Sequence, residues 1–68
     1  MMERVRTYLS RVVKPSLYYF GRNTQEKNLE FFLHTKNLAR LCGLGSDNGF
    51  NPQIYEDAIT EVRERMRV

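Results

Sequence analysis

The chain has 68 residues, of which 41% are hydrophobic and 28% charged, and its net charge is +3 at pH 7. This length allows one domain, and the composition is that of a folded rather than a disordered protein. The only cysteine is Cys42 and the only histidine is His34, which excludes an internal disulfide and a structural zinc site with four such ligands. Because a chain this short buries little apolar surface, we expect it to gain stability from a partner.

The positive charge is concentrated in the N-terminal third. Residues 1–22 contain five basic residues and one acidic residue, whereas residues 46–68 have a net charge of −2. No apolar stretch approaches the ~20 residues that cross a bilayer, and we find no secretory signal. Together with the unpaired cysteine, this favours an intracellular protein. Within the cell, the protein is expected either in the cytoplasm or at a membrane surface, including a mitochondrial one.

The first predicted helix covers about residues 2–20. Apolar side chains recur at helical spacing, at Val5, Leu9, Val12 and Val13. Pro15 predicts either a kink or the start of a new helical turn near Lys14, because proline lacks the amide hydrogen that an interior helical position needs. An aromatic cluster then precedes Gly21, and it consists of Tyr18, Tyr19 and Phe20.

The basic residues of this helix, Arg4, Arg6, Arg11 and Lys14, have three interpretations. They are the solvated side of a core helix, or they face phosphate headgroups while the tyrosines lie at headgroup depth. The third interpretation is a mitochondrial targeting segment, although Glu3 and the scarcity of serine count against it. All three predict that these side chains are exposed.

The second predicted helix covers about residues 24–42. Asn23 is a suitable N-cap with Glu26 three residues later, and Gly43 is a suitable stop. On a helical wheel, apolar residues occupy most of the circumference: Phe31, Leu38 and Cys42, then Ala39 and Phe32, then Leu29 and Leu33. A helix of this kind needs burial on several sides, which two neighbours from one short chain do not fully provide. His34 lies among these residues, and we interpret it as a buried or partner-facing side chain with one hydrogen bond.

The third predicted helix covers about residues 52–67 and has the strongest start signal. Asn51 is a favoured N-cap and Pro52 suits the first helical position, while Phe50 and Tyr55 occupy the two positions of a hydrophobic staple. The apolar stripe consists of Ile54, Tyr55, Ala58, Ile59, Val62 and Met66. Glu61 and Arg65 have the spacing of a favourable ion pair.

The stretch LARLCGLGSDNGFNP, residues 38–52, resembles the first half of a bacterial helix-turn-helix in the spacing of Ala39 and Gly43. That motif requires a second helix after a turn of three or four residues, whereas Pro52 places the next helix about eight residues further on. Two acids, Glu56 and Asp57, would also face the DNA phosphates. The loop matches neither a dinucleotide fingerprint nor a calcium loop, so we interpret it as a flexible connector.

No group of residues predicts catalysis, a metal site or a cofactor. His34 and Cys42 are about 12 Å apart along one helix, too far for a nucleophile and its base. The serines have no base nearby in sequence, and the carboxylates are dispersed. We therefore expect a protein that is not an enzyme.

The sequence predicts one all-α domain over residues 1–68, a small three-helix domain with a Pro-kinked basic N-terminal helix and an antiparallel first pair. The leading hypothesis is a non-catalytic accessory or adaptor subunit of a larger assembly, with hetero- or homo-oligomeric partners and peripheral membrane contact as an option. Its predicted protein-binding residues are Tyr18, Tyr19, Phe20, Phe31, Phe32 and Leu38. The alternative is a small regulatory nucleic-acid-binding protein, less favoured, which uses a degenerate helix-turn-helix or the four basic residues Arg4, Arg6, Arg11 and Lys14.

Overall fold

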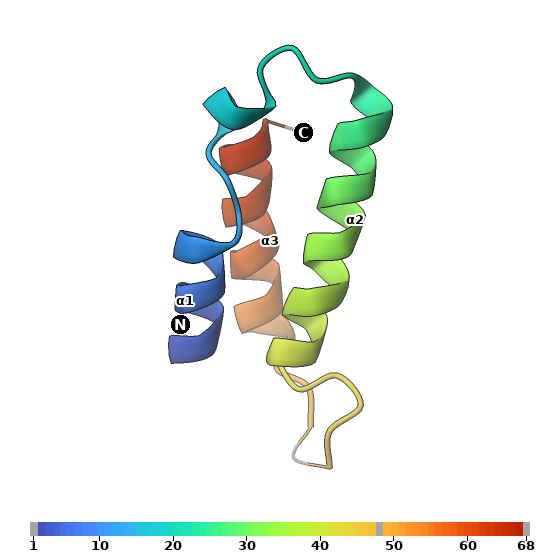
Figure 1. Ribbon diagram of the computed structural model, residues 1–68. Coiled ribbons are helices and arrows are strands. Elements are labelled where there is room, and N and C mark those ends of the chain that lie inside the picture. Colours follow the sequence, from blue (N-terminus) through green and yellow to red (C-terminus); the bar gives the residue numbers. More distant parts are fainter. Residues whose placement is uncertain (1, 48, 68) are drawn as a thin grey trace.

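The computed structural model describes residues 2–47 and 49–67. Its elements are α1 (Glu3–Arg11), a short 3₁₀ helix η1 (Ser16–Tyr19), α2 (Thr24–Leu41) and α3 (Pro52–Met66). In Figure 1, α1 and α3 run in one direction and α2 runs in the other, so the three helices form an up-down-up bundle. The described residues contain no strand. The predicted all-α three-helix fold is confirmed.

The N-terminal segment is broken rather than kinked. α1 ends at Arg11, and Pro15 has an extended backbone that leads into η1. A proline ring collides with the carbonyl four residues earlier and disfavours helical geometry in the residue before it, which accounts for the interruption between Arg11 and Pro15. The predicted kink within one helix over residues 2–20 is therefore not confirmed, although the position of the break agrees with the position of the proline.

A side chain from α3 stabilises the end of α1. The amide of Val13 donates to Tyr8 O, so the carbonyl of Leu9 does not receive its usual helical hydrogen bond. The Arg65 guanidinium on α3 donates to this carbonyl instead, which places a positive charge at the negative end of the α1 dipole. Arg65 Nε also lies 3.7 Å from Glu61 Oε2, as the spacing predicted.

The starts of α2 and α3 are confirmed at the predicted residues. The Asn23 side chain accepts a hydrogen bond from the Glu26 amide at 2.8 Å, and the Asn51 side chain accepts one from the Ile54 amide at 3.2 Å. The rings of Phe50 and Tyr55 lie 5.4 Å apart across the start of α3, as expected for a hydrophobic staple.

The connector between α2 and α3 is closed at its base. Cys42 O accepts a hydrogen bond from the Asn51 amide at 3.0 Å. Gly43 has φ +101°, and a Cβ atom there would overlap the carbonyl oxygen of Gly49. Only glycine combines this backbone conformation with so close an approach. The two helices are therefore held as antiparallel neighbours.

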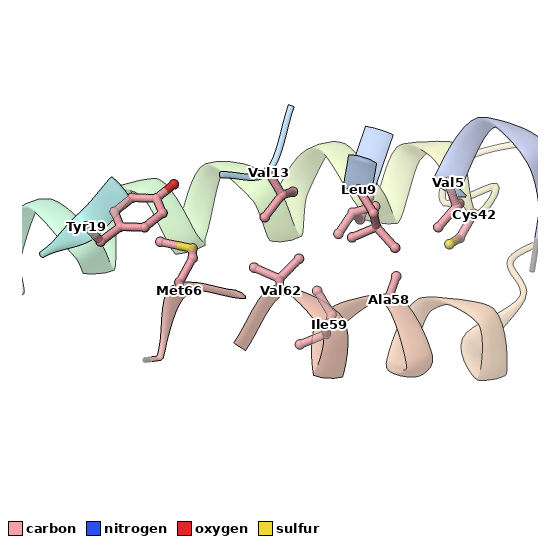
Figure 2. Packing of buried hydrophobic residues seen from close by; sticks show 10 residues of the cluster. Val5, Leu9, Val13, Tyr19, Cys42, Ala58, Ile59, Val62 and Met66 are labelled. Atoms are coloured by element: carbon pink, nitrogen blue, oxygen red, sulfur yellow. The ribbon is translucent and has the colours of Figure 1, made fainter. Parts of the chain in front are cut away.

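The core lies along the centre of the bundle (Figure 2), where α1, η1, α2 and α3 all contribute buried side chains. The packed cluster of buried residues consists of Val5, Leu9, Val13, Tyr19, Leu38, Cys42, Ala58, Ile59, Val62 and Met66. Because α1 has only nine residues, η1 continues the packing along α3 where α1 has ended. Tyr19 and Met66 meet at that end of the core (Figure 2).

Candidate protein-interaction surface

One side of α2 carries large apolar side chains that no other helix covers. Leu29, Phe32 and Leu33 are 59%, 57% and 56% exposed. At 100° per residue they lie opposite Leu38, which is completely buried in the core. α1 and α3 pack with α2 around Leu38, and Figure 1 shows both of them on one side of α2. We call this surface, formed by Leu29, Phe32 and Leu33, the outer face of α2.

Charged side chains border the outer face of α2 at its two ends. Glu26 lies towards the N-terminus of the helix, and Lys36 and Arg40 lie towards its C-terminus, all three exposed. Lys36 Nζ lies 5.4 Å from the centroid of the Phe32 ring, which is a cation–π contact. The face is thus apolar in the middle, acidic at one end and basic at the other.

A second exposed apolar group lies in the N-terminal segment. Leu17 and Phe20 are 81% and 86% exposed, and they line a shallow hollow of about 340 Å³ together with Lys27, Met66 and Arg67. We call Leu17 and Phe20 the η1 tip. Their exposure follows from the short 3₁₀ helix, which turns Tyr19 into the core and its apolar neighbours outward.

The six predicted protein-binding residues fall into two groups. Phe20, Phe32 and Tyr18 are exposed, and Phe31 is half-buried beneath the Arg63 guanidinium. Tyr19 and Leu38 are completely buried within the chain itself, so an interaction surface of this fold does not include them. Sequence reasoning did not select Leu17, Leu29 and Leu33, although the wheel placed Leu29 and Leu33 far from Leu38.

A polar cluster fills the space between α1 and α2. The Tyr8 hydroxyl lies 2.8 Å from His34 Nδ1 and accepts a hydrogen bond from Asn37 Nδ2 at 3.0 Å. Burial lowers the pKa of His34, although the Glu30 carboxylate, 3.5 Å from Nε2, opposes this shift. The lowered pKa favours the neutral ring, whose Nδ1 can accept the hydrogen bond from Tyr8. His34 is thus a buried histidine with one hydrogen bond.

Arg22 joins the loop after η1 to this cluster. Its guanidinium lies 3.7 Å from Glu30, donates to the Tyr18 hydroxyl at 2.8 Å and lies 4.6 Å from the centroid of the Tyr18 ring. Burial raises the pKa of Tyr19, and the charge of Glu30 adds to that shift. The contacts with Arg22 hold the exposed side chain of Tyr18 in place. The η1 tip stays exposed to solvent.

The basic residues of the N-terminal segment are exposed, as predicted. Arg4, Arg6, Arg11 and Lys14 all face solvent. Among the described residues, no acidic side chain forms an ion pair with the three arginines. By helical position Arg4 and Arg11 share one side of α1 and Arg6 lies on another. Arg4 and Arg40 also line an open hollow of about 680 Å³ at the connector end of the bundle.

The remaining candidate chemistry is limited in the part of the chain that the structure describes. Cys42 is buried, and burial raises the pKa of its thiol, which disfavours the reactive thiolate. No three His, Cys, Asp or Glu side chains among residues 2–47 and 49–67 come together as metal ligands. Within the same ranges, no helix has the length and apolarity required to cross a membrane.

The arrangement of α2 and α3 differs from a helix-turn-helix. That motif crosses two helices at about 90–120° after a short turn, whereas α2 and α3 run antiparallel side by side (Figure 1). The apolar stripe of α3, which includes Ala58, Ile59 and Val62, is buried in the core. The structure therefore does not place α3 as a recognition helix.

Comparisons with known protein families, curated proteins and solved structures find no match.

Proposed function

We propose that this protein is a non-catalytic adaptor or accessory subunit, and that it contacts another protein chain through the outer face of α2. The observation that carries this proposal is that Leu29, Phe32 and Leu33 are each more than half exposed on one side of one helix. The bundle core is complete without them.

The free energy of burial supports this proposal. Removing apolar surface from water contributes about 25 cal/mol per Å², so covering three large side chains on one helix favours association. Monomeric proteins rarely expose contiguous apolar patches larger than a few hundred Å², whereas scattered apolar residues are ordinary. The three side chains are adjacent, at helical spacings of one, three and four residues, and polar residues surround them. The η1 tip offers a second contact of the same kind.

Site-specific photo-crosslinking in cells tests this function. A photoreactive phenylalanine analogue at Phe32 should give covalent adducts with a protein chain, because this position lies in the middle of the outer face. The same analogue at Glu64, an exposed position on α3, is the matched control and should give few. Leu33→Glu should remove the adducts formed from position 32, since a charge would then have to be buried in the contact. Equal labelling at positions 32 and 64, or none at either, would contradict the proposal.

A phosphate-bearing partner is the second candidate, and the exposed, unpaired arginines of α1 favour it. Arg4, Arg6 and Arg11 have no acidic neighbour within ion-pair distance among the described residues, so their charges are available to an external anion. Nucleic acid is one such partner. An anionic membrane surface inside the cell, for example a mitochondrial one, is another.

The salt dependence of the binding constant tests the nucleic-acid hypothesis. If three arginines contact phosphates of duplex DNA, log K should fall with log salt with a slope of roughly −2.7, that is about −0.9 for each phosphate. The triple variant Arg4→Gln, Arg6→Gln and Arg11→Gln should then lose binding in a fluorescence anisotropy titration. Binding that the triple variant retains would exclude this route.

A further inference from the structure

We propose that a second copy of this chain occupies the outer face of α2, with the two α2 helices packed antiparallel around a two-fold axis. This inference rests on the function proposed above, because it names the occupant of the same face. Its basis is the order of the charged and apolar residues along α2.

Five exposed residues of α2 form one continuous seam. Their spacing alternates between three and four residues, and in order they are Glu26, Leu29, Leu33, Lys36 and Arg40. This alternation is the pattern that keeps one line of side chains in contact with a neighbouring helix. The core of the chain uses the opposite side of α2, through His34, Leu38 and Cys42. The seam is thus a second packing surface on a helix whose first packing surface is already occupied.

Glu26 and Lys36 on the seam are complementary in charge when the two α2 helices run antiparallel. In an antiparallel pair whose two-fold axis crosses the seam at the height of residue 31, Leu29 lies against the partner subunit's Leu33 and Glu26 lies against the partner subunit's Lys36. The two-fold axis repeats both contacts, so two apolar pairs lie between two ion pairs. A parallel pair in register would instead place Glu26 against Glu26 and Lys36 against Lys36, and like charges in contact are unfavourable.

Phe32 extends the contact beside the seam. Phe32 is 57% exposed, and the Lys36 ammonium lies 5.4 Å from the centroid of its ring. α2 has 18 residues and is therefore about 27 Å long. A specific interface needs about 1,000 Å² in total, or about 500 Å² from each chain, which is one tenth of the 4987 Å² surface of this protein.

Charge exchange tests the predicted ion pairs. We expect sedimentation velocity of the purified chain to show a reversible monomer–dimer equilibrium. Glu26→Lys and Lys36→Glu should each raise the dimer dissociation constant tenfold or more, because each brings like charges together. The double variant should restore the wild-type constant, since it rebuilds both ion pairs with reversed polarity. Glu64→Lys changes the net charge as much as Glu26→Lys does but lies on α3, so it should leave dimerisation unchanged.

Disulfide trapping tests the direction and the register. Leu29→Cys and Leu33→Cys chains mixed in equal amounts should oxidise to a mixed dimer joined between positions 29 and 33. Each variant alone should form much less disulfide, and the buried Cys42 is common to all samples. A strong link between position 29 and itself would indicate a parallel pair and overturn the proposal.

The outcomes separate this inference from the function on which it rests. A chain that stays monomeric at every concentration, but still forms adducts with another protein from position 32, overturns the dimer and leaves the adaptor function intact. A dimer that the single charge reversals do not weaken also overturns the proposed pairing. A monomer without any adduct from position 32 contradicts both. Circular dichroism of each variant, with an unchanged helical spectrum, ensures that lost association is not lost folding.

Discussion

The imidazole of His34 is enclosed between α1 and α2, and only one of its two ring nitrogens has a hydrogen bond. Nδ1 accepts from Tyr8, whereas Nε2 is buried without a hydrogen-bond partner. A neutral ring tolerates this environment better than a charged one, because burial disfavours the protonated form more than Glu30 favours it. The residue therefore links the stability of the bundle to pH.

We expect the protein to lose stability as the pH falls below about 7. Because the pKa of His34 is lower in the folded chain than the ordinary value of 6.5, the unfolded chain takes up a proton first. The free energy of unfolding then falls as the pH decreases through about 6.5 and levels off once the folded chain is protonated as well. Urea denaturation at pH 7.5, 6.5 and 5.5 measures this change, which His34→Gln should abolish. Equal losses in the two proteins over this range would contradict the assignment.

At the scale of the elements, local capping determines where α2 and α3 begin. Asn23 and Asn51 each satisfy a backbone amide in the first turn of a helix, and residues adjacent in sequence provide these bonds. Both starts were therefore predictable. The break after α1 was predictable in position, because Pro15 imposes it locally. The sequence left open whether the proline kinks one helix or starts a new turn, because Arg65 and the burial of Tyr19 stabilise the break from elsewhere in the chain.

The same substitution at two asparagines should have opposite effects on stability. Asn51→Ala removes the N-cap of α3 and should lower the free energy of unfolding by about 1 kcal/mol. Asn28→Ala, at an exposed position within α2, should raise it by a few tenths of a kcal/mol, because alanine has the higher helix propensity. Urea denaturation of both variants measures the difference. A loss at position 28 equal to that at position 51 would show that the cap contributes nothing specific.

At the scale of the whole molecule, two leucines five residues apart on α2 have opposite environments. Leu38 is completely buried and Leu33 is 56% exposed. Leu38→Ala should lower the free energy of unfolding by about 2–5 kcal/mol, because it leaves a cavity in the core. Leu33→Ala should cost less than about 1 kcal/mol in the monomer. Urea denaturation at a protein concentration where the wild type is monomeric tests this. Similar losses of unfolding free energy in the two variants would contradict the burial of Leu38 and the exposure of Leu33.

The sequence by itself determined the number of helices, the starts of α2 and α3 and the exposure of the basic residues near the N-terminus. Caps, proline and charge act through neighbours along the chain, so their effects need no tertiary structure. The tertiary structure decided which apolar side of α2 is covered. On a helical wheel, α2 is apolar around most of its circumference, but α1 and α3 pack against the side that carries Leu38 and Cys42. Leu29, Phe32 and Leu33 stay exposed because two helices can cover only one side of a third.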